Sequence, residues 1–324
     1  MELVSKRRLR LYAGRATQEL AAEIAELLDD ELRSVKLVDF ASGETYCRFE
    51  ESVRDTDVFV IQSHVAPVND AIMEQLIMID AAKRASAKRI TAVCPYFGYG
   101  RQDRKALSRE PITAKLIADL FGAAGVDRVI GVDLHSGQIQ GFFDVPFDHL
   151  TAFPVLEDYV ARNIDSANLV VVAPDAGRVK TAERFAHRIG ADIAFAHKRR
   201  SREQAHQVEV DEVIGEVEGR HCVIIDDMID TAGTVCAAAD LLKRRGASDC
   251  WIMATHGILS GPAVDRLKNA PISKLVITNS VPLPKDRQFD KLEVVSVAGV
   301  LASAIESVFE GSSVSDLFQG ENQL

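Results

Sequence analysis

Residues Val223–Thr234 read VIIDDMIDTAGT and join an apolar run, a pair of acids and a loop of small residues. The β-branched start predicts a buried strand, and helical spacing follows over Ala237–Arg245. Ala232 and Gly233 leave room for backbone N–H groups to approach a phosphate where that helix begins, at the positive end of its dipole. This stretch therefore predicts a strand, an anion-binding loop and a helix in succession.

The side chains of this segment suit a phosphorylated sugar. The hydroxyls of Thr231 and Thr234 can donate to a phosphate, and Asp226 and Asp227 can accept hydrogen bonds from neighbouring ribose hydroxyls. An acidic loop that only caps a helix would explain one Asp and one Thr, but not the whole string. We therefore expect a sugar phosphate to bind at this loop.

Similar apolar runs recur along the chain, separated by stretches with helical spacing. The expected strands are Val58–Gln62, Ile90–Cys94, Val129–Val132, Leu169–Ala173, Cys222–Asp226, Trp251–Thr255 and Leu275–Thr278. Amphipathic helices are expected over Glu19–Leu28, over Asn69–Ala85 with Asn69 as the N-cap, and over Gly299–Phe309. Strands and helices in repeated alternation predict an α/β fold, with mainly parallel sheets flanked by helices.

No Ser-, Gly- or Pro-rich linker marks a domain boundary, so the boundary is placed where the alternation breaks. Gly141–Thr151 contains Pro146 and interrupts the pattern, with similar cycles of strand and helix before and after it. We expect a first domain over residues 1–150 and a second domain over residues 151–299. The remaining segment, residues 300–324, is expected to pack back on the first domain.

Composition argues against several classes of protein. The 324 residues carry a net charge of −10, whereas a general nucleic-acid binder needs a basic surface. No apolar stretch is long enough for a signal peptide or a membrane span, so we expect a cytoplasmic protein without a membrane partner. The five Cys residues are scattered, which is typical of small buried side chains rather than of disulfides or a zinc cluster. Two basic islands, Arg101–Arg109 and Lys198–Arg202, are compatible with a small, highly charged anion or, as for most charge runs, with a solvated loop face.

Polar residues follow several of the expected strands, and ligands of parallel sheets bind beyond the carboxyl ends of strands. The sequence PYFGYGRQDRK follows Ile90–Cys94, and Asp133 and His135 follow Val129–Val132. Asp175 follows the next expected strand. The motif G-x-x-x-x-G-K-[ST] is missing from the sequence, so any ATP would bind without a P-loop.

Five motifs, several of them long, resemble the ribose-phosphate pyrophosphokinase family, whose members make phosphoribosyl pyrophosphate. They are YFGYGRQDRK (96–105), SREPITAK (108–115), VDLHSGQIQGFFDVP (132–146), KRR (198–200) and DDMIDTAGT (226–234). The similarity extends from Leu11 to Phe318. It implies two phosphoribosyltransferase-like domains, a cytosolic homohexamer, ATP and ribose 5-phosphate as substrates, and Mg²⁺ as cofactor.

The resemblance implies roles for residues of the second expected domain. Those that match the family's ribose 5-phosphate loop are Asp226, Asp227, Asp230, Thr231, Ala232, Gly233 and Thr234. Lys198 and Arg200 match a mobile catalytic loop, and Arg200 also matches a ribose 5-phosphate contact. Negative charge spreads over the phosphate oxygens during transfer, so fixed cations at these two positions would stabilise the transition state. Lys198 would supply a point charge and Arg200 a planar fork.

The resemblance also implies an ATP site and a metal site. Matching ATP contacts are Arg101, Gln102 and His135, together with Phe40, Ser42, Gly43 and Glu44, which in the family reach the adenine from a neighbouring subunit. His135 and Asp175 match the magnesium positions. From its residue type alone, His135 would be interpreted as a hydrogen-bonding residue at a strand end, because Mg²⁺ prefers oxygen ligands.

Two other functions are compatible with parts of the sequence. A nucleobase phosphoribosyltransferase shares the sugar-phosphate loop, but it does not need a second α/β unit or two basic islands. A non-catalytic regulatory homologue would keep the fold and the oligomer without turnover. The sequence departs from many relatives at Ser42, Arg178, Thr181 and Ser201, where those relatives carry Asp or Asn, Gly, Arg and Pro.

Overall fold

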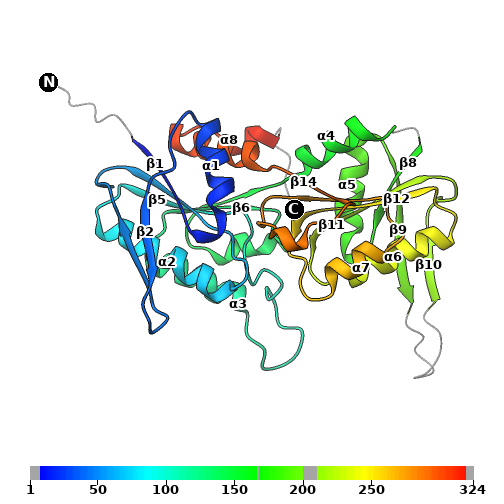
Figure 1. Ribbon diagram of the computed structural model, residues 1–324, viewed down its shortest axis with the longest axis horizontal. Coiled ribbons are helices and arrows are strands. Elements are labelled where there is room, and N and C mark those ends of the chain that lie inside the picture. The colour runs from blue at the N-terminus through cyan, green and yellow to red at the C-terminus, as the bar shows by residue number, and fades with distance from the viewer. Residues whose placement is uncertain (1–7, 166–167, 200–209, 319–324) are drawn as a thin grey trace. The chain divides into compact units, whose positions relative to one another are not determined.

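The computed structural model describes residues 8–165, 168–199 and 210–318. Within these residues the chain divides into two compact units (Figure 1). Unit 1 comprises the chain up to Thr151, the short segment Ser280–Pro282 and the chain from Ser296 onward. Unit 2 comprises Ala152–Asn279 and Leu283–Val295.

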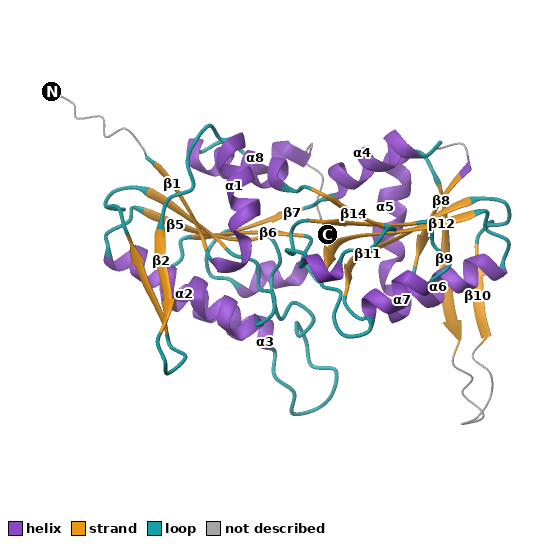
Figure 2. Cartoon of the chain, in the orientation of Figure 1, coloured by secondary structure: helices purple, strands orange, loops and turns teal. Residues whose placement is uncertain are grey.

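Unit 1 is built on a five-stranded parallel sheet. The strand order is β1 (Leu9–Ala13), β4 (Asp57–Ile61), β5 (Arg89–Cys94), β6 (Arg128–Val132) and β7 (Phe147–Leu150). Its helices are α1 (Gln18–Leu27), α2 (Val68–Arg84), α3 (Thr113–Ala124) and α8 (Ala298–Glu310). Helix α8 packs against α1, and α2 packs against α3 (Figure 2). The two pairs cover opposite faces of the sheet, so the C-terminal helix belongs to the same unit as the first strand.

A separate two-stranded hairpin projects from unit 1. Strands β2 (Val35–Asp39) and β3 (Thr45–Phe49) pair antiparallel, and β3 lies against α2. The ring of Phe49 packs edge-on against the ring of Tyr12 in β1. These contacts fix the base of the hairpin on the unit and leave its turn exposed.

Unit 2 contains a seven-stranded sheet that is parallel except at one edge. The strand order is β10 (Val210–Ile214), β9 (Asp192–Arg199), β8 (Leu169–Ala173), β11 (His221–Ile229), β12 (Asp249–Gly257), β13 (Lys274–Thr278) and β14 (Leu292–Val295). Only the β9–β10 pair among these described strands is antiparallel. The helices are α4 (Phe153–Asn163), α5 (Val179–Ile189), α6 (Gly233–Arg244) and α7 (Ala263–Asn269).

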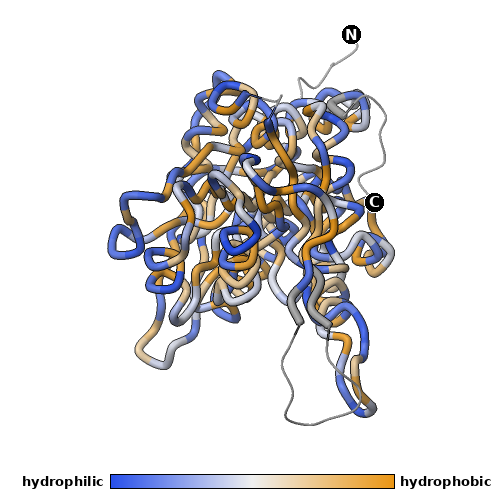
Figure 3. The backbone as a smooth tube through the Cα atoms, turned by 90° about the vertical axis from the view of Figure 1, so that its right-hand side faces the viewer, coloured by the Kyte–Doolittle hydropathy of each residue, from blue (hydrophilic) through white to orange (hydrophobic). Residues whose placement is uncertain are grey.

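Alternate residues of the central strands enter two different cores in unit 2. Val171 and Val223 face the cluster that contains Phe185 of α5, whereas Val172 and Ile224 face the cluster that contains the apolar side of α6. Side chains of a strand alternate between faces, so a strand covered on both sides must be apolar throughout. In Figure 3 the hydrophobic stretches of the backbone lie mostly inside and the hydrophilic stretches mostly outside.

The α/β fold class expected from the sequence is confirmed, and each of the seven expected strands is present with ends shifted by at most a few residues. The N-cap prediction for Asn69 is wrong. Pro67 occupies that position, and Asn69 lies inside α2, where its Oδ1 accepts a hydrogen bond from Tyr99. Gly141–Thr151, expected to interrupt the pattern, contains strand β7. Among the described residues, no helix combines the length and the apolar content needed to cross a bilayer.

Candidate active site

The loop after β11 forms an open start to helix α6. Strand β11 runs through both acids, and Ala232 adopts a left-handed backbone conformation with φ of 60° directly before the helix. Thr231, Gly233 and Thr234 are exposed, so the first backbone amides of α6 face solvent. Exposed amides at the positive end of a helix dipole attract an anion. The geometry thus fits the phosphate role expected for this loop.

Arg266, which the motifs did not point to, lies beside this loop. Its Nη1 donates to the carbonyl oxygen of Thr231 at 2.9 Å, and the same atom would lie 3.5 Å from a Cβ added to Gly233. A cation at a helix N-terminus is unfavourable without an anion. The only sequence signal for Arg266 is its position in a helix that follows β12, at the same edge of the sheet.

The acidic pair at the end of β11 is held by Arg178. The Nε atom of Arg178 lies 2.9 Å from Asp226 Oδ1, and its Nη2 lies 2.6 Å from Asp227 Oδ1. Burial and the adjacent charge of Asp227 raise the pKa of Asp226 above its ordinary range, while Arg178 acts in the opposite direction. The sequence showed Arg178 only as a departure from its relatives.

The remaining expected residues of unit 2 lie on neighbouring strands. Asp175 follows β8, is exposed, and accepts a hydrogen bond from the backbone N–H of Gly177 at 2.8 Å. Lys198 was expected on a loop, but its backbone lies in β9, where it pairs with Asp211 of β10. Arg200 lies outside the described residues.

In unit 1, the loop after β5 and the residues after β6 lie together. Gly100 is next to His135, because a Cβ added to Gly100 would lie 3.6 Å from the Cβ of His135. Arg101 and Gln102 follow directly and are exposed. The Oε1 of Gln102 accepts a hydrogen bond from the hydroxyl of Thr113 at 2.5 Å, which ties the loop to the start of α3. The structure therefore places Arg101, Gln102 and half-buried His135 at one edge of the sheet.

A buried histidine anchors this loop. Nδ1 of His64 accepts a hydrogen bond from the backbone N–H of Gly98 at 3.0 Å, and Nε2 donates to Oε1 of Gln75 at 2.8 Å. Burial lowers the pKa of His64 to about 4, so the ring is neutral at physiological pH. Sequence reasoning missed His64, because its role depends on a loop 34 residues further along the chain.

The hairpin turn that carries Phe40, Ser42, Gly43 and Glu44 is well defined. The backbone N–H of Gly43 donates to the carbonyl of Phe40 at 2.8 Å, and φ of Gly43 is 89°, which favours glycine. The hydroxyl of Ser42 donates to Glu44 at 2.6 Å. Phe40 is 56% exposed. In Figure 1 this turn lies apart from the loop that follows β5, so the described chain does not bring the two expected ATP segments together.

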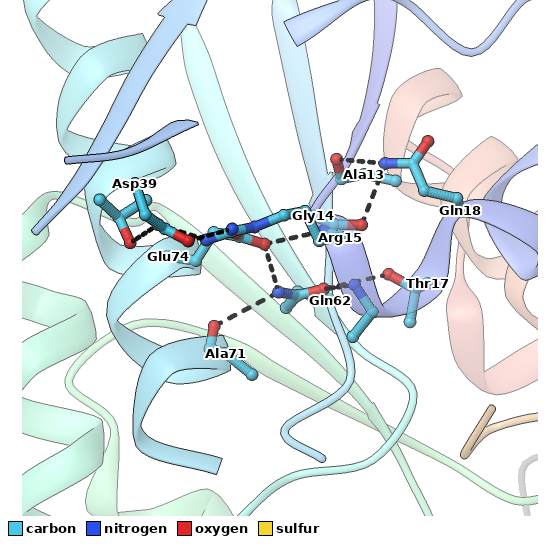
Figure 4. A network of polar contacts seen from close by, with 11 residues as sticks. Ala13, Gly14, Arg15, Thr17, Gln18, Asp39, Gln62, Ala71 and Glu74 are labelled. Carbon is cyan, nitrogen blue, oxygen red and sulfur yellow. Dashed lines mark hydrogen bonds and ion pairs between the residues drawn. The ribbon is translucent and has the colours of Figure 1, made fainter. Parts of the chain in front are cut away.

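A polar network holds the hairpin at the end next to its turn (Figure 4). Arg15 donates to both carboxylate oxygens of Asp39, at 2.5 and 2.8 Å, and its Nε donates to Glu74, a carboxylate buried in α2. Gln62 also donates to Glu74, at 2.8 Å. Hydrogen bonds from Arg15 and Thr45 lower the pKa of Asp39. The network therefore connects the end of β2 to helix α2.

The fold and these strand-end groups define a class of α/β protein with an exposed helix start and a buried acidic pair. Two sequence models match the chain. One, described as the N-terminal domain of ribose phosphate pyrophosphokinase, matches residues 9–125. The other, described as the phosphoribosyl synthetase-associated domain, matches residues 209–319.

Whole-chain comparisons narrow this class to one family. The chain is 53% identical over 318 residues to the ribose-phosphate pyrophosphokinase of Streptomyces coelicolor, covering 98% of both chains. It is 51% identical to that of Mycobacterium leprae, covering 98% of this chain and 97% of the relative. The crystal structure of phosphoribosylpyrophosphate synthetase from Mycobacterium smegmatis superposes with a TM-score of 0.89 at 48% identity, covering 94% of this chain and all of that chain. The chain belongs to the ribose-phosphate pyrophosphokinase family.

Proposed function

We propose that this chain transfers the β,γ-pyrophosphate of ATP to the C1 hydroxyl of ribose 5-phosphate. The products are 5-phosphoribosyl 1-pyrophosphate and AMP, and the former supplies nucleotide, His and Trp biosynthesis in the cytoplasm. The observation that carries this proposal is the β11–α6 junction, where an acidic pair precedes exposed amides at a helix start. One end of this loop suits a diol and the other suits a phosphate.

Ribose 5-phosphate is assigned to the second domain, residues 151–299. Its 5-phosphate would accept hydrogen bonds from the amides at Gly233 and Thr234 and from the hydroxyl of Thr231, all of which are exposed. Its hydroxyls would donate to Asp226 and Asp227, which lie on the strand side of the loop. Asp230 and Ala232 shape the turn between these two ends.

ATP is assigned to residues of the first domain, residues 1–150. Arg101 and Gln102 are exposed on a loop that three anchors hold: His64, Thr113 and the contact of Tyr99 with Asn69. Arg101 would bind phosphate oxygens through its planar fork, and Gln102 would orient the nucleotide. Lys198 and Arg200 would supply the charges that stabilise the transferring group.

The proposed site residues also suit a Mg²⁺ ion that is bound to the phosphate oxygens of ATP. Mg²⁺ in such sites takes one or two carboxylates and completes its shell with phosphates and water. Asp175 offers an exposed carboxylate at the end of β8, and His135 is half-buried at the end of β6. When bound, such an ion would neutralise charge on the pyrophosphate. Asp175 and His135 are each proposed to contact Mg²⁺, directly or through water.

We also propose that the protein works as a homo-oligomer, a hexamer by the family resemblance. Ile112, Leu116 and Leu120 are spaced four residues apart at the start and along one side of α3, and they are 37%, 55% and 38% exposed. An apolar stripe of this kind is typical of a surface that another chain covers. The exposed hairpin turn would then offer Phe40, Ser42, Gly43 and Glu44 to the nucleotide of a second copy.

AMP release tests the proposed reaction. The purified chain is incubated with ATP, ribose 5-phosphate and MgCl₂, and AMP and phosphoribosyl pyrophosphate are measured together. We expect both products in equal amounts, and none when ribose 5-phosphate is omitted. Pyrophosphate release from phosphoribosyl pyrophosphate plus a nucleobase, without AMP from ATP, would indicate a phosphoribosyltransferase instead. Substrate binding without either product would indicate a non-catalytic homologue.

A further inference from the structure

Arg178 occupies the space between two strand ends of unit 2. It closes a short 3₁₀ turn, Ala176–Arg178, which follows β8, and helix α5 begins at the next residue. Strands β8 and β11 are parallel neighbours in the sheet. Their carboxyl ends therefore lie at the same edge, which is why Arg178 reaches residues 48 and 49 positions further along the chain.

The contact is buried and involves both acids. The side chains of Arg178, Asp226 and Asp227 are only 16%, 13% and 7% exposed. Two different nitrogens of the guanidinium reach the two carboxylates, at 2.9 and 2.6 Å. Exposed ion pairs contribute little to stability, but charges this buried require a partner.

Neighbouring carboxylates at a buried site repel each other, so they need a cation to remain good hydrogen-bond acceptors. A ribose diol is neutral and cannot supply that charge. A carboxylate has two oxygens and accepts several hydrogen bonds, so contact with a guanidinium is compatible with a second contact to a diol. The backbone N–H groups of Asp227 and Met228 also donate to the Oδ1 atoms of Asp226 and Asp227, which fixes the rotation of each carboxylate.

We propose that Arg178 is a positioning residue of the ribose subsite. Its guanidinium orients both carboxylates and compensates their charge, so that they accept hydrogen bonds from the vicinal hydroxyls of the sugar. This inference rests on the proposed assignment of Asp226 and Asp227 to ribose. Arg178 would therefore act through Asp226 and Asp227 and would not contact the reacting atoms.

The test compares the substrate constants of the variants Arg178→Met and Arg178→Lys, with Arg162→Met as the matched control. Arg162 lies in the same unit and forms an exposed pair with Asp158, so its loss should leave both substrate constants unchanged. Losing hydrogen bonds to charged groups should raise the KM for ribose 5-phosphate about 10- to 100-fold in Arg178→Met. The KM for ATP should stay within about twofold because its assigned residues lie elsewhere. Arg178→Lys should recover part of the loss, since an ammonium keeps the charge without the fork.

The double variant Arg178→Met with Asp226→Asn separates positioning from folding. If Arg178→Met lowers the urea midpoint, the double variant should restore it toward that of the parent, because removing one carboxylate relieves the repulsion. The KM for ribose 5-phosphate should stay high in the double variant. An unchanged KM for ribose 5-phosphate in a folded Arg178→Met variant would overturn the proposal. A raised KM for ATP alone would overturn it as well.

The parent chain distinguishes this failure from a failure of the proposed function. If the parent releases no AMP, the proposed reaction is wrong. Calorimetric binding of ribose 5-phosphate to the parent and to Arg178→Met then tests Arg178 directly. Equal affinities for the two proteins would refute its role.

Discussion

Replacing Gly98 by Ala should disturb the loop that carries the proposed ATP contacts. The new Cβ would lie 2.7 Å from the Cβ of His64 and 3.3 Å from Cγ1 of Val68. Carbon atoms in contact prefer a separation of about 3.5–4.0 Å, so one side must move by about 1 Å. The clashing atom is the Cβ of His64, which side-chain rotation does not move, so the backbone must shift against the hydrogen bonds that hold both ring nitrogens.

The expected cost follows from these contacts. Overpacking a buried site costs about 1–3 kcal/mol, and weakening one of the two His64 hydrogen bonds adds about 1 kcal/mol. We therefore expect Gly98→Ala to lower the free energy of unfolding by about 2–4 kcal/mol. Because Arg101 and Gln102 follow in the same loop, the KM for ATP should rise about 10-fold or more, while that for ribose 5-phosphate changes little.

Gly100→Ala is the matched control, since its added Cβ would have contacts of 3.5 Å and longer. Unfolding in urea should be followed by circular dichroism, because the single Trp, Trp251, lies in unit 2 and would not report on this loop. Substrate constants come from AMP release. The packing argument is wrong if the free energies of unfolding of Gly98→Ala and Gly100→Ala differ by less than about 0.5 kcal/mol and the two variants have the same KM for ATP.

Four further predictions concern other parts of the chain. The pKa of His64 falls from 6.5 in the unfolded chain to about 4 in the folded chain. The neutral ring therefore makes its full contribution to the free energy of unfolding above pH 6.5, and this contribution is lost as the pH falls toward the folded pKa. Between about pH 7.5 and about pH 5 the parent should lose about 2 kcal/mol more unfolding free energy than His64→Gln; equal losses in urea titrations would contradict this. Lys198→Ala should lower turnover about 10²- to 10³-fold with little change in substrate binding, and AMP release within about twofold of the parent would remove Lys198 from catalysis. Gly233→Val should raise the KM for ribose 5-phosphate and spare that for ATP, and the reverse pattern would assign this loop to the nucleotide. Leu116→Glu should reduce the mass measured by light scattering together with activity, whereas a fully active monomer would refute the shared ATP site.

The local chemistry of the chain was readable from sequence because it depends on neighbours along the backbone. Alternation of apolar runs with helical spacing indicates buried parallel strands, and those strands are present. The run from Asp226 to Thr234 combines acids, small residues and hydroxyls within one short segment, so the expectation of a sugar phosphate could be drawn from neighbours along the chain. The family resemblance followed from the same local motifs.

Some locally plausible predictions were changed by tertiary contacts. Asn69 has a good N-cap side chain, yet Pro67 occupies the N-cap position and the amide oxygen of Asn69 accepts a hydrogen bond from Tyr99. Lys198 reads as part of a basic loop, but pairing with Asp211 extends strand β9 through it. In both cases a partner from elsewhere in the chain outweighs the local preference.

Only the tertiary structure revealed the residues that support the site. Arg178 meets Asp226 because β8 and β11 are adjacent, and Arg266 reaches Thr231 because α7 follows the next strand at the same edge. His64 fixes Gly98 through contacts between two strand ends of the other sheet. An isolated Arg or His has no distinctive neighbours in the sequence, and its function arises from charges and hydrogen-bond partners that only the packing of the sheet brings within reach. The sequence by itself determined the order of the elements and the chemistry of the loop, whereas the fold decided which distant side chains hold that loop in place.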